Sequence, residues 1–240
     1  MWMTTTATSW TSFEHIFNPS GERPLWVSVP LFLQTPMNEI DEVLFSHSPA
    51  VMVPRFGKLS TPEGSGHRYL VASTGVFLHV YRPWLDLKTM IAPSSVRLPF
   101  GDVQQACALP MGQVPTRLVR HFYDRAFSSC PNEAVALVVW NEKTRVFRYI
   151  EPHVETVSRD HVTYQRPDLG DGEHLVLDMH SHGRAPAFFS ATDDIDDASE
   201  VKFSLVFGSL DCPTPTVAMR LCAQGVFLNQ PVTREALIWR

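Results

Sequence analysis

Two histidines and an aspartate carry the clearest chemical pattern in the chain. His180 and His182 end an apolar-alternating run that starts at Glu173 and is typical of a β-strand. Because alternate strand residues point to one face, the two imidazoles are predicted to reach a single metal ion. Asp193, brought back by the intervening loop, is the predicted third ligand. Zinc commonly binds His nitrogen and carboxylate oxygen, and a catalytic zinc keeps one position open for water. The pattern therefore predicts a zinc site whose water needs a base from elsewhere in the chain.

Glu133 is the candidate for that base. It opens the near-continuous apolar run 133–140, which has the length of a strand, and it comes directly after a predicted helix. That helix is predicted over 115–127, with Pro115 at an early position and Pro131 beyond its end. A carboxylate in this place lies naturally at the end of a sheet.

The elements that must position these residues alternate in type. Further strands are predicted where apolar residues alternate or cluster, at 145–150, 161–164, 201–208, 216–221 and 225–228. The order of one helix followed by several strands predicts an α+β fold class, with a mixed β-sheet flanked by helices.

The first hundred residues have a different texture. Residues 1 to about 22 are polar and Thr/Ser-rich, and the strand-like segment Leu25–Leu33 is interrupted by Pro30. Strands are predicted at 50–53, 68–73 and 75–81, the last two joined as a hairpin. Prolines punctuate residues 92–114, so we predict a smaller, mostly β or α+β N-terminal domain over 1–110 and a second domain over 111–240. The N-terminal domain contains no catalytic constellation.

Composition narrows the possible functions. The 240 residues carry a formal net charge of -5, which gives no general reason to expect nucleic-acid binding. The 4 cysteines lack CxxC spacing, so reduced thiols are expected rather than a disulfide framework or zinc ribbon. No apolar run reaches the roughly 20 residues that span a bilayer, so no membrane association is expected. The N-terminus lacks a secretory pattern, so the cytoplasm is the expected location. The sequence does not predict an oligomeric state.

These residues together resemble a known family. The spacing His-Ser-His, seven residues, Ser, two residues, Asp, with an upstream Pro-x-Glu opening a strand, is similar to the JAMM (MPN+/Jab1-type) zinc metallopeptidases. The resemblance covers about residues 112–240 and implies a core of the JAMM and cytidine-deaminase type. It implies that His180, His182 and Asp193 hold Zn²⁺, that Glu133 is the general base and acid, and that Ser190 stabilises the oxyanion. One departure is the run Ala134–Leu137 after the glutamate, where the family often has small residues or glycine.

The resemblance also implies a reaction and partners. A zinc-bound water would attack the carbonyl of a peptide or isopeptide bond at the C-terminus of a ubiquitin-like or sulfur-carrier-like protein. Such an extended tail could be cradled by the loop Gly183–Phe189. The run Pro186–Asp194 and the long N-terminal extension resemble more narrowly the protein A family of bacterial PRTRC cassettes. Those cassettes also encode ThiF/E1-like and ubiquitin-related proteins, which implies a conjugation-type pathway.

Simpler interpretations of the same residues remain open. The histidines could be a hydrogen-bonded pair at a strand end, Asp193 and Ser190 could cap a helix, and Glu133 could be a surface carboxylate. The other acidic residues of the run, Asp194, Asp196 and Asp197, are expected to face solvent, and the EF-hand pattern is absent. At the level of function, the alternatives are a non-catalytic partner-binding scaffold of the same fold and a zinc amidase acting on a small molecule.

Overall fold

The computed structural model describes residues 37–158 and 162–232, and those from Val43 onward form a compact unit. The predicted polar lead-in and the predicted strand Leu25–Leu33 lie outside the described residues. Helix α1 (Glu39–His47) was not predicted. It follows Asn38, whose side-chain oxygen accepts a 2.9 Å hydrogen bond from the backbone N–H of Ile40. An asparagine at this place is a common start for a helix.

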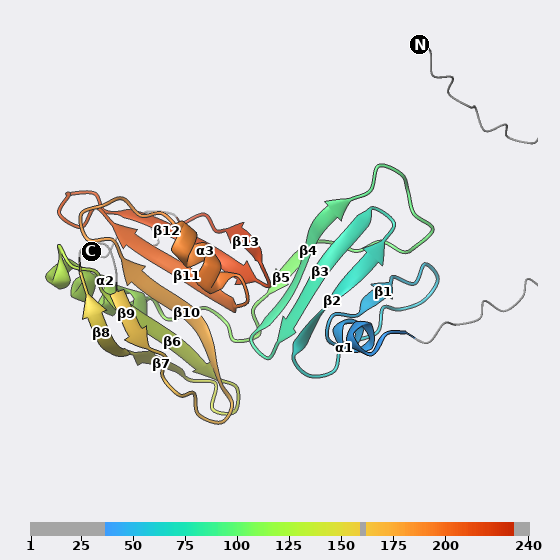
Figure 1. The fold of residues 1–240 in the computed structure, drawn as a ribbon, viewed down its shortest axis with the longest axis horizontal. Helices are drawn as coiled ribbons and strands as arrows, with labels where there is room; N and C mark the ends of the chain where they lie inside the picture. The colour runs from blue at the N-terminus through green and yellow to red at the C-terminus, as the bar shows by residue number, and fades with distance from the viewer. Residues whose placement is uncertain (1–36, 159–161, 233–240) are drawn as a thin grey trace, which may run out of the picture. The chain divides into compact units, whose positions relative to one another are not determined.

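A five-stranded sheet follows α1 (Figure 1). Its strands, in the spatial order β1-β2-β3-β4-β5, are β1 (Ala50–Met52), β2 (Gly66–Ala72), β3 (Gly75–Arg82), β4 (Leu85–Pro93) and β5 (Ala106–Ala108). The first three and the β2–β3 hairpin match the predicted strands, whereas β4 and β5 were not predicted. Leu70, Ala72 and Phe77 pack with Val53 as a small apolar core for this sheet. The segment is mostly β, as expected.

The six-stranded sheet of the C-terminal part carries the predicted chemistry. Its strands, in the spatial order β13-β12-β11-β10-β6-β7, are β6 (Val135–Asn141), β7 (Phe147–Ile150), β10 (Glu173–Ser181), β11 (Val201–Gly208), β12 (Thr216–Ala223) and β13 (Val226–Asn229). β10 pairs in parallel with β11 and antiparallel with β6, so the sheet is mixed. The predicted α+β fold class with a mixed sheet and flanking helices is therefore confirmed.

The two faces of this sheet differ because side chains alternate along each strand. Leu205 and Phe207 of β11 and Leu221 of β12 belong to an apolar core. Phe122 of helix α2 (Thr116–Ser129) is fully buried in the same core, and its ring centroid lies 6.0 Å from that of Phe207. The β11 residues that alternate with Phe203, Leu205 and Phe207, such as Lys202 and Ser204, point to the opposite face. A register shift in β10 between Leu175 and Leu177 allows the histidine-bearing end of the strand to share that polar face.

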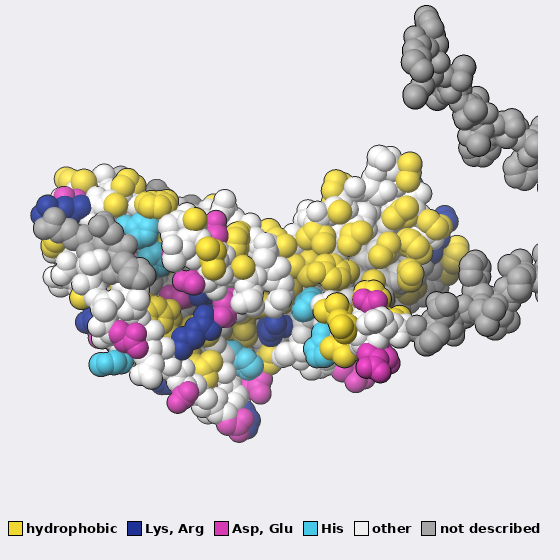
Figure 2. All heavy atoms as spheres, viewed as in Figure 1, with side chains coloured by type: hydrophobic (Ala, Val, Ile, Leu, Met, Phe, Trp, Pro, Cys, Tyr) yellow, Lys and Arg dark blue, Asp and Glu magenta, His cyan; other side chains and the backbone are white. Residues whose placement is uncertain are grey.

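Two smaller elements lie over the polar face. Helix α3 (Ala191–Asp197) is seven residues long and connects β10 to β11 (Figure 1). The ribbon β8 (His153–Val157) and β9 (Val162–Gln165) is inserted between β7 and β10, and only β9 was predicted. The space-filling view shows His, acidic and basic side chains gathered near α3 on this face (Figure 2).

Candidate metal centre

The predicted ligands come together at one end of the six-stranded sheet. One ligand atom from each of His180, His182 and Asp193 lies within 4.8 Å of the others. The Nε2 atoms of the two histidines are 3.2 Å apart, and Nε2 of His180 is 3.6 Å from Oδ1 of Asp193. Zn–N distances of about 2.0–2.1 Å place neighbouring tetrahedral ligand atoms roughly 3.3 Å apart. The measured separations therefore fit a single zinc ion.

A hydrogen bond outside this cluster orients His182. Its Nδ1 lies 3.2 Å from the carbonyl oxygen of Pro186, so the ring donates there and leaves Nε2 as the acceptor. Metal-binding histidines usually make such a bond with their other nitrogen, because it fixes the tautomer and the ring orientation. His182 is also buried, and its backbone N–H donates to Phe207 of β11 over 2.8 Å.

The two carboxylate oxygens of Asp193 have different partners. Oδ2 accepts hydrogen bonds from the backbone N–H of Ser190 at 2.6 Å and from its hydroxyl at 2.7 Å. In return, Ser190 Oγ accepts from the backbone N–H of Asp193 at 3.2 Å, which completes a capping box at the start of α3. Oδ1 is the oxygen that lies near His180. Capping and metal binding, which the sequence left as alternatives, are thus compatible in one residue.

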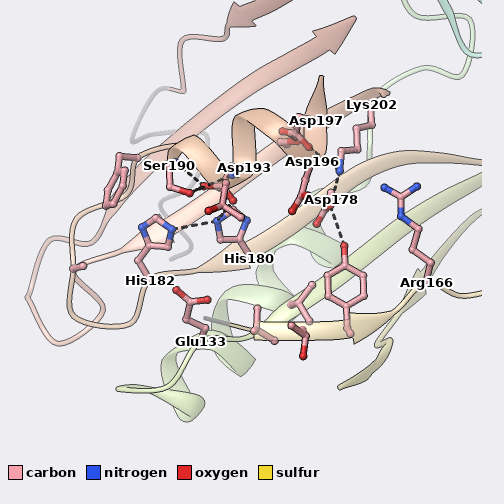
Figure 3. A pocket seen from close by; sticks show the side chains of 18 residues that line it. Glu133, Arg166, Asp178, His180, His182, Ser190, Asp193, Asp196, Asp197 and Lys202 are labelled. Atoms are coloured by element: carbon pink, nitrogen blue, oxygen red, sulfur yellow. Dashed lines mark hydrogen bonds and ion pairs between the residues drawn. The ribbon is translucent and has the colours of Figure 1, made fainter. Parts of the chain in front are cut away.

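Glu133 reaches the same end of the sheet because β6 runs antiparallel to β10. Val135 begins β6 and pairs with His180, so Glu133 lies just before the strand rather than inside it. Ser181, the residue between the two histidines, is fully buried and anchors this segment twice. Its hydroxyl accepts a 3.0 Å hydrogen bond from the backbone N–H of Ala134, and its own N–H donates to the carbonyl of Ala134. The Glu133 side chain lies below the histidines in Figure 3.

The loop Gly183–Phe189 is fixed at several points. Gly183 has φ +53°, and a Cβ there would lie 2.3 Å from the carbonyl oxygen of Pro131, so only glycine fits. The N–H of Ser209 donates to Ala185, and that of Leu210 donates to Gly183. These bonds hold the loop against the segment that follows β11, whereas the close approach of Gly183 to Pro131 places it beside the segment that leads to Glu133.

The two phenylalanines of this loop have different surroundings. Phe188 is half-exposed, and its ring centroid lies 4.6 Å from that of His182 in an edge-on arrangement. Phe189 instead packs over the guanidinium of Arg220, 4.0 Å from its ring centroid. Of the two, Phe188 therefore lines the site.

A cavity of about 480 Å³ joins the five predicted site residues. Glu133, His180, His182, Ser190 and Asp193 all line it. Its other walls come from β9, α3 and β11, including Tyr164, Arg166, Asp196 and Lys202. This volume lies in the range of about 300–1,000 Å³ that is usual for small-molecule and substrate sites.

Buried charges adjoin the cavity and correct one expectation. Asp197 was expected to face solvent with Asp194 and Asp196, but it is 4 % exposed and pairs with Lys202 and Arg220. Burial alone would raise the pKa of the Asp197 carboxyl, yet the Lys202 ammonium lowers it below its usual value. Asp194 is half-exposed and pairs with Arg220, whereas Asp196 is exposed as expected. The positive charges of Lys202 on β11 and Arg220 on β12 offset the free-energy cost of burying the Asp197 carboxylate.

Burial also affects the pKa of the first histidine. It lowers the pKa of His180 below its usual value, although the Asp193 carboxylate opposes the shift. A neutral imidazole is the form that binds a metal ion. The donor set, the separations and the second hydrogen bond of His182 all fit Zn²⁺.

The fold and the site define a class, an α+β domain with a His-His-Asp cluster that could hold a metal ion at the end of a mixed sheet. Residues 115–222 match the family described as prokaryotic homologs of the JAB domain, which supports their assignment to the JAB/MPN family. Residues 38–110 match a domain family of unknown function, DUF2016. The family match is compatible with a hydrolase. Whether this chain can catalyse hydrolysis depends on the residues at its own site.

No curated protein matches this chain. The solved structures that match include the solution structure of protein DSY2949 from Desulfitobacterium hafniense, with 19% identity over 48% of this chain and 86% of that chain. Its TM-score of 0.37 is too low to support an argument. No helix in the described ranges 37–158 and 162–232 has the length and apolar character needed to cross a membrane.

Sequence reasoning missed the residues that support the ligands. Ser181, Lys202 and Arg220 are buried, and none of them was singled out. A signal for the two cations was present, since each stands inside a strand pattern where its neighbours on both sides are apolar. A charge inside such a strand predicts a buried partner.

Proposed function

We propose that this protein is a zinc-dependent hydrolase that cleaves a peptide or isopeptide bond at the C-terminus of a ubiquitin-like or sulfur-carrier-like protein. The observation that carries the proposal is the convergence of His180, His182 and Asp193 at ligand separation, in a cavity that Glu133 and Ser190 also line. The match of residues 115–222 to the JAB family supports the same reaction class.

The three ligand residues would hold Zn²⁺, which supplies a Lewis acid and a water whose pKa is lowered toward ~7. The Glu133 carboxylate accepts a proton from the attacking water and returns it to the departing amine nitrogen. Glu133 therefore acts first as general base and then as general acid. A hydrogen-bond donor of the chain would help to stabilise the charge that develops on the carbonyl oxygen.

Ser190 is the proposed hydrogen-bond donor to the oxyanion, but its hydroxyl already has an acceptor. Its hydroxyl donates to Asp193 Oδ2, so it must rotate away from that oxygen before it can donate to a substrate oxyanion. The backbone N–H of Ser190 also donates to the same carboxylate oxygen and can keep the cap in place during that rotation.

The substrate tail would enter as an extended segment beside the cavity. Phe188 is exposed beside His182, which makes it the aromatic residue of the loop Gly183–Phe189 suited to contact the tail. Replacing Phe188 with alanine should raise KM with little change in zinc content. An unchanged KM would exclude this contact. The narrower PRTRC resemblance adds ThiF/E1-like proteins as proposed pathway partners.

The test is incubation of the full chain with ubiquitin-like fusion proteins, with and without a chelator. Cleavage at the C-terminus of the ubiquitin-like part, lost on chelation and restored by zinc, is expected. If the purified wild-type protein binds no zinc, the proposed zinc-dependent hydrolase activity is excluded. A zinc-loaded protein that binds such a partner without cleaving it would favour the scaffold, and cleavage of small amides alone would favour a small-molecule amidase.

A further inference from the structure

A chain of four charged residues, Asp178, Lys202, Asp197 and Arg220, lies behind the candidate metal centre, and the last three are buried. Figure 3 shows the first three of them. Lys202 Nζ lies 2.7 Å from Asp178 Oδ2 and 2.9 Å from Asp197 Oδ1. The other carboxylate oxygen of Asp197, Oδ2, accepts two hydrogen bonds from Arg220, one from Nε at 3.2 Å and one from Nη2 at 2.8 Å. The side chains of Lys202 and Arg220 are each only 3% exposed.

This chain connects the two elements that carry the ligands. Asp178 lies two residues before His180 on β10, so both side chains point to the same face. Asp197 lies four residues after Asp193 in α3, so both lie on one side of that helix. Lys202 therefore bridges the histidine-bearing strand and the aspartate-bearing helix.

Arg220 fixes the same helix at a second point. It pairs with Asp194 through Nη1, and its guanidinium lies between two aromatic rings, 4.0 Å from the Phe189 centroid and 4.1 Å from that of Phe227. Phe189 directly precedes Ser190, the residue that caps α3. A planar guanidinium can stack and form paired hydrogen bonds at once, which an ammonium cannot. Arg220 thus holds both the start of α3 and the loop before it.

Stability alone does not explain such a network. Replacing a complete buried ionic network with neutral residues of similar volume is often neutral or stabilising, because burying the charges is itself unfavourable. Second hydrogen bonds of metal-binding residues, by contrast, are known to control affinity. The side chains of the two histidines are adjacent at the end of one strand, so only their distance from Asp193 depends on how two elements pack together. The network spans those two elements, β10 and α3.

We propose that Lys202 and Arg220 are positioning residues that hold α3 against β10 and thereby set the place of Asp193 relative to His180 and His182. The inference rests on the proposed function, since it assumes that these three residues bind zinc. It predicts that the two cations control zinc affinity although neither contacts the metal.

The experiment measures the zinc dissociation constant of the full chain by competition with a chromophoric chelator. Lys202→Met and Arg220→Met should each weaken zinc binding by roughly 10- to 100-fold, the range seen for outer partners of metal ligands. Arg220→Lys keeps a charge near Asp197 but loses the paired bonds and the stacking, so an intermediate affinity is expected. Leu221→Ala is the control, because Leu221 is equally buried on β12 but faces the apolar core. It should lower the unfolding temperature and leave zinc affinity unchanged.

A triple variant guards against variants that fail to fold. Lys202→Met combined with Asp178→Asn and Asp197→Asn removes the lysine together with both of its carboxylate partners, while Arg220 keeps its ion pair with Asp194. Circular dichroism checks the fold of this variant. The proposal expects this variant to fold and to bind zinc more weakly than wild type. If it binds zinc as tightly, or if Leu221→Ala weakens binding as much as Arg220→Met does, the proposal is overturned while the proposed function stands. A wild type that binds no zinc overturns both.

Discussion

The hydroxyl of Ser181 accepts a 3.0 Å hydrogen bond from the backbone N–H of Ala134, and both residues are buried. This bond ties the segment that carries Glu133 to the strand that carries the two histidines. The middle residue of the His-Ser-His pattern therefore positions the segment of the proposed base, whereas its two neighbours are the proposed metal ligands.

Replacing Ser181 with alanine tests this relationship. The Ala134 N–H would lose its side-chain acceptor in a buried place, a change that costs about 1–3 kcal/mol of stability. We expect a lower unfolding temperature and reduced turnover, with zinc content unchanged. Ser128→Ala, on the exposed side of α2, is the control because it removes only a hydrogen bond to Asp124 within the helix. Loss of zinc from the Ser181 variant would argue that the bond supports the ligands instead.

Glu133→Gln separates proton transfer from metal binding. The amide keeps the size of the side chain but cannot accept the proton, so turnover should fall by about 10²- to 10⁴-fold. Zinc affinity should remain that of wild type, because Glu133 is not among the ligand atoms that cluster. Glu142→Gln, which alters a carboxylate paired with His174 away from the cavity, should change neither quantity. Full activity in the Glu133 variant would remove the residue from its proposed role.

Two substitutions of Ser190 distinguish helix capping from oxyanion stabilisation. Alanine removes the cap and should cost about 1 kcal/mol, whereas glycine, a tolerated cap residue, should cost only a few tenths. Both remove the hydroxyl, so both should lower kcat if it stabilises the oxyanion. Thermal unfolding and steady-state kinetics on the two variants give the comparison. A glycine variant with wild-type kcat would show that Ser190 acts only as a cap.

The N-terminal sheet should lose stability in mild acid. His79 is buried, and its Nδ1 accepts a 3.1 Å hydrogen bond from Arg68 Nε while Nε2 contacts Asp86 Oδ1 at 2.9 Å. A second proton on the ring would go to Nδ1, where it would face the Arg68 guanidinium. Burial, together with the nearby Lys88 ammonium, lowers the pKa of His79 below its usual value.

The direction of the pH effect follows from this lowered pKa. The unfolded chain takes up the proton near pH 6.5, before the folded chain does, so stability is complete above about pH 6.5 and decreases below it. Thermal unfolding between about pH 7.5 and 5.5 should show this slope in wild type and a smaller one in His79→Gln. Equal slopes would contradict the prediction.

The sequence could predict the cluster of His180, His182 and Asp193 because spacing along one strand and one short loop defines it. His180 and His182 share a face by strand geometry alone, and Asp193 lies only eleven residues further on. The strands with strong alternation, such as β11, were also predicted to the residue. Strand β5, with three small exposed residues, offers no periodic signal and was missed.

The supporting residues could not be predicted in the same way. Lys202 and Asp178 are 24 residues apart, and their contact depends on the parallel pairing of β10 with β11. Asp197 looked like its exposed neighbour Asp196, and the positions of Lys202 on β11 and Arg220 on β12 decide which of them is buried. Tertiary pairing, rather than local pattern, sets these contacts.

If Oδ1 of Asp193 binds zinc as proposed, the cap that Oδ2 makes would couple metal occupancy to the folding of helix α3. A ligand that binds only the folded state stabilises it by about 2.7 kcal/mol at a free concentration of 100 Kd. Zinc would deliver that stabilisation through the same side chain that begins the helix, so removal of the metal should loosen α3 first. Hydrogen exchange in α3 would then slow as free zinc rises and quicken as free zinc falls, so the exchange rate of this short helix would report metal occupancy.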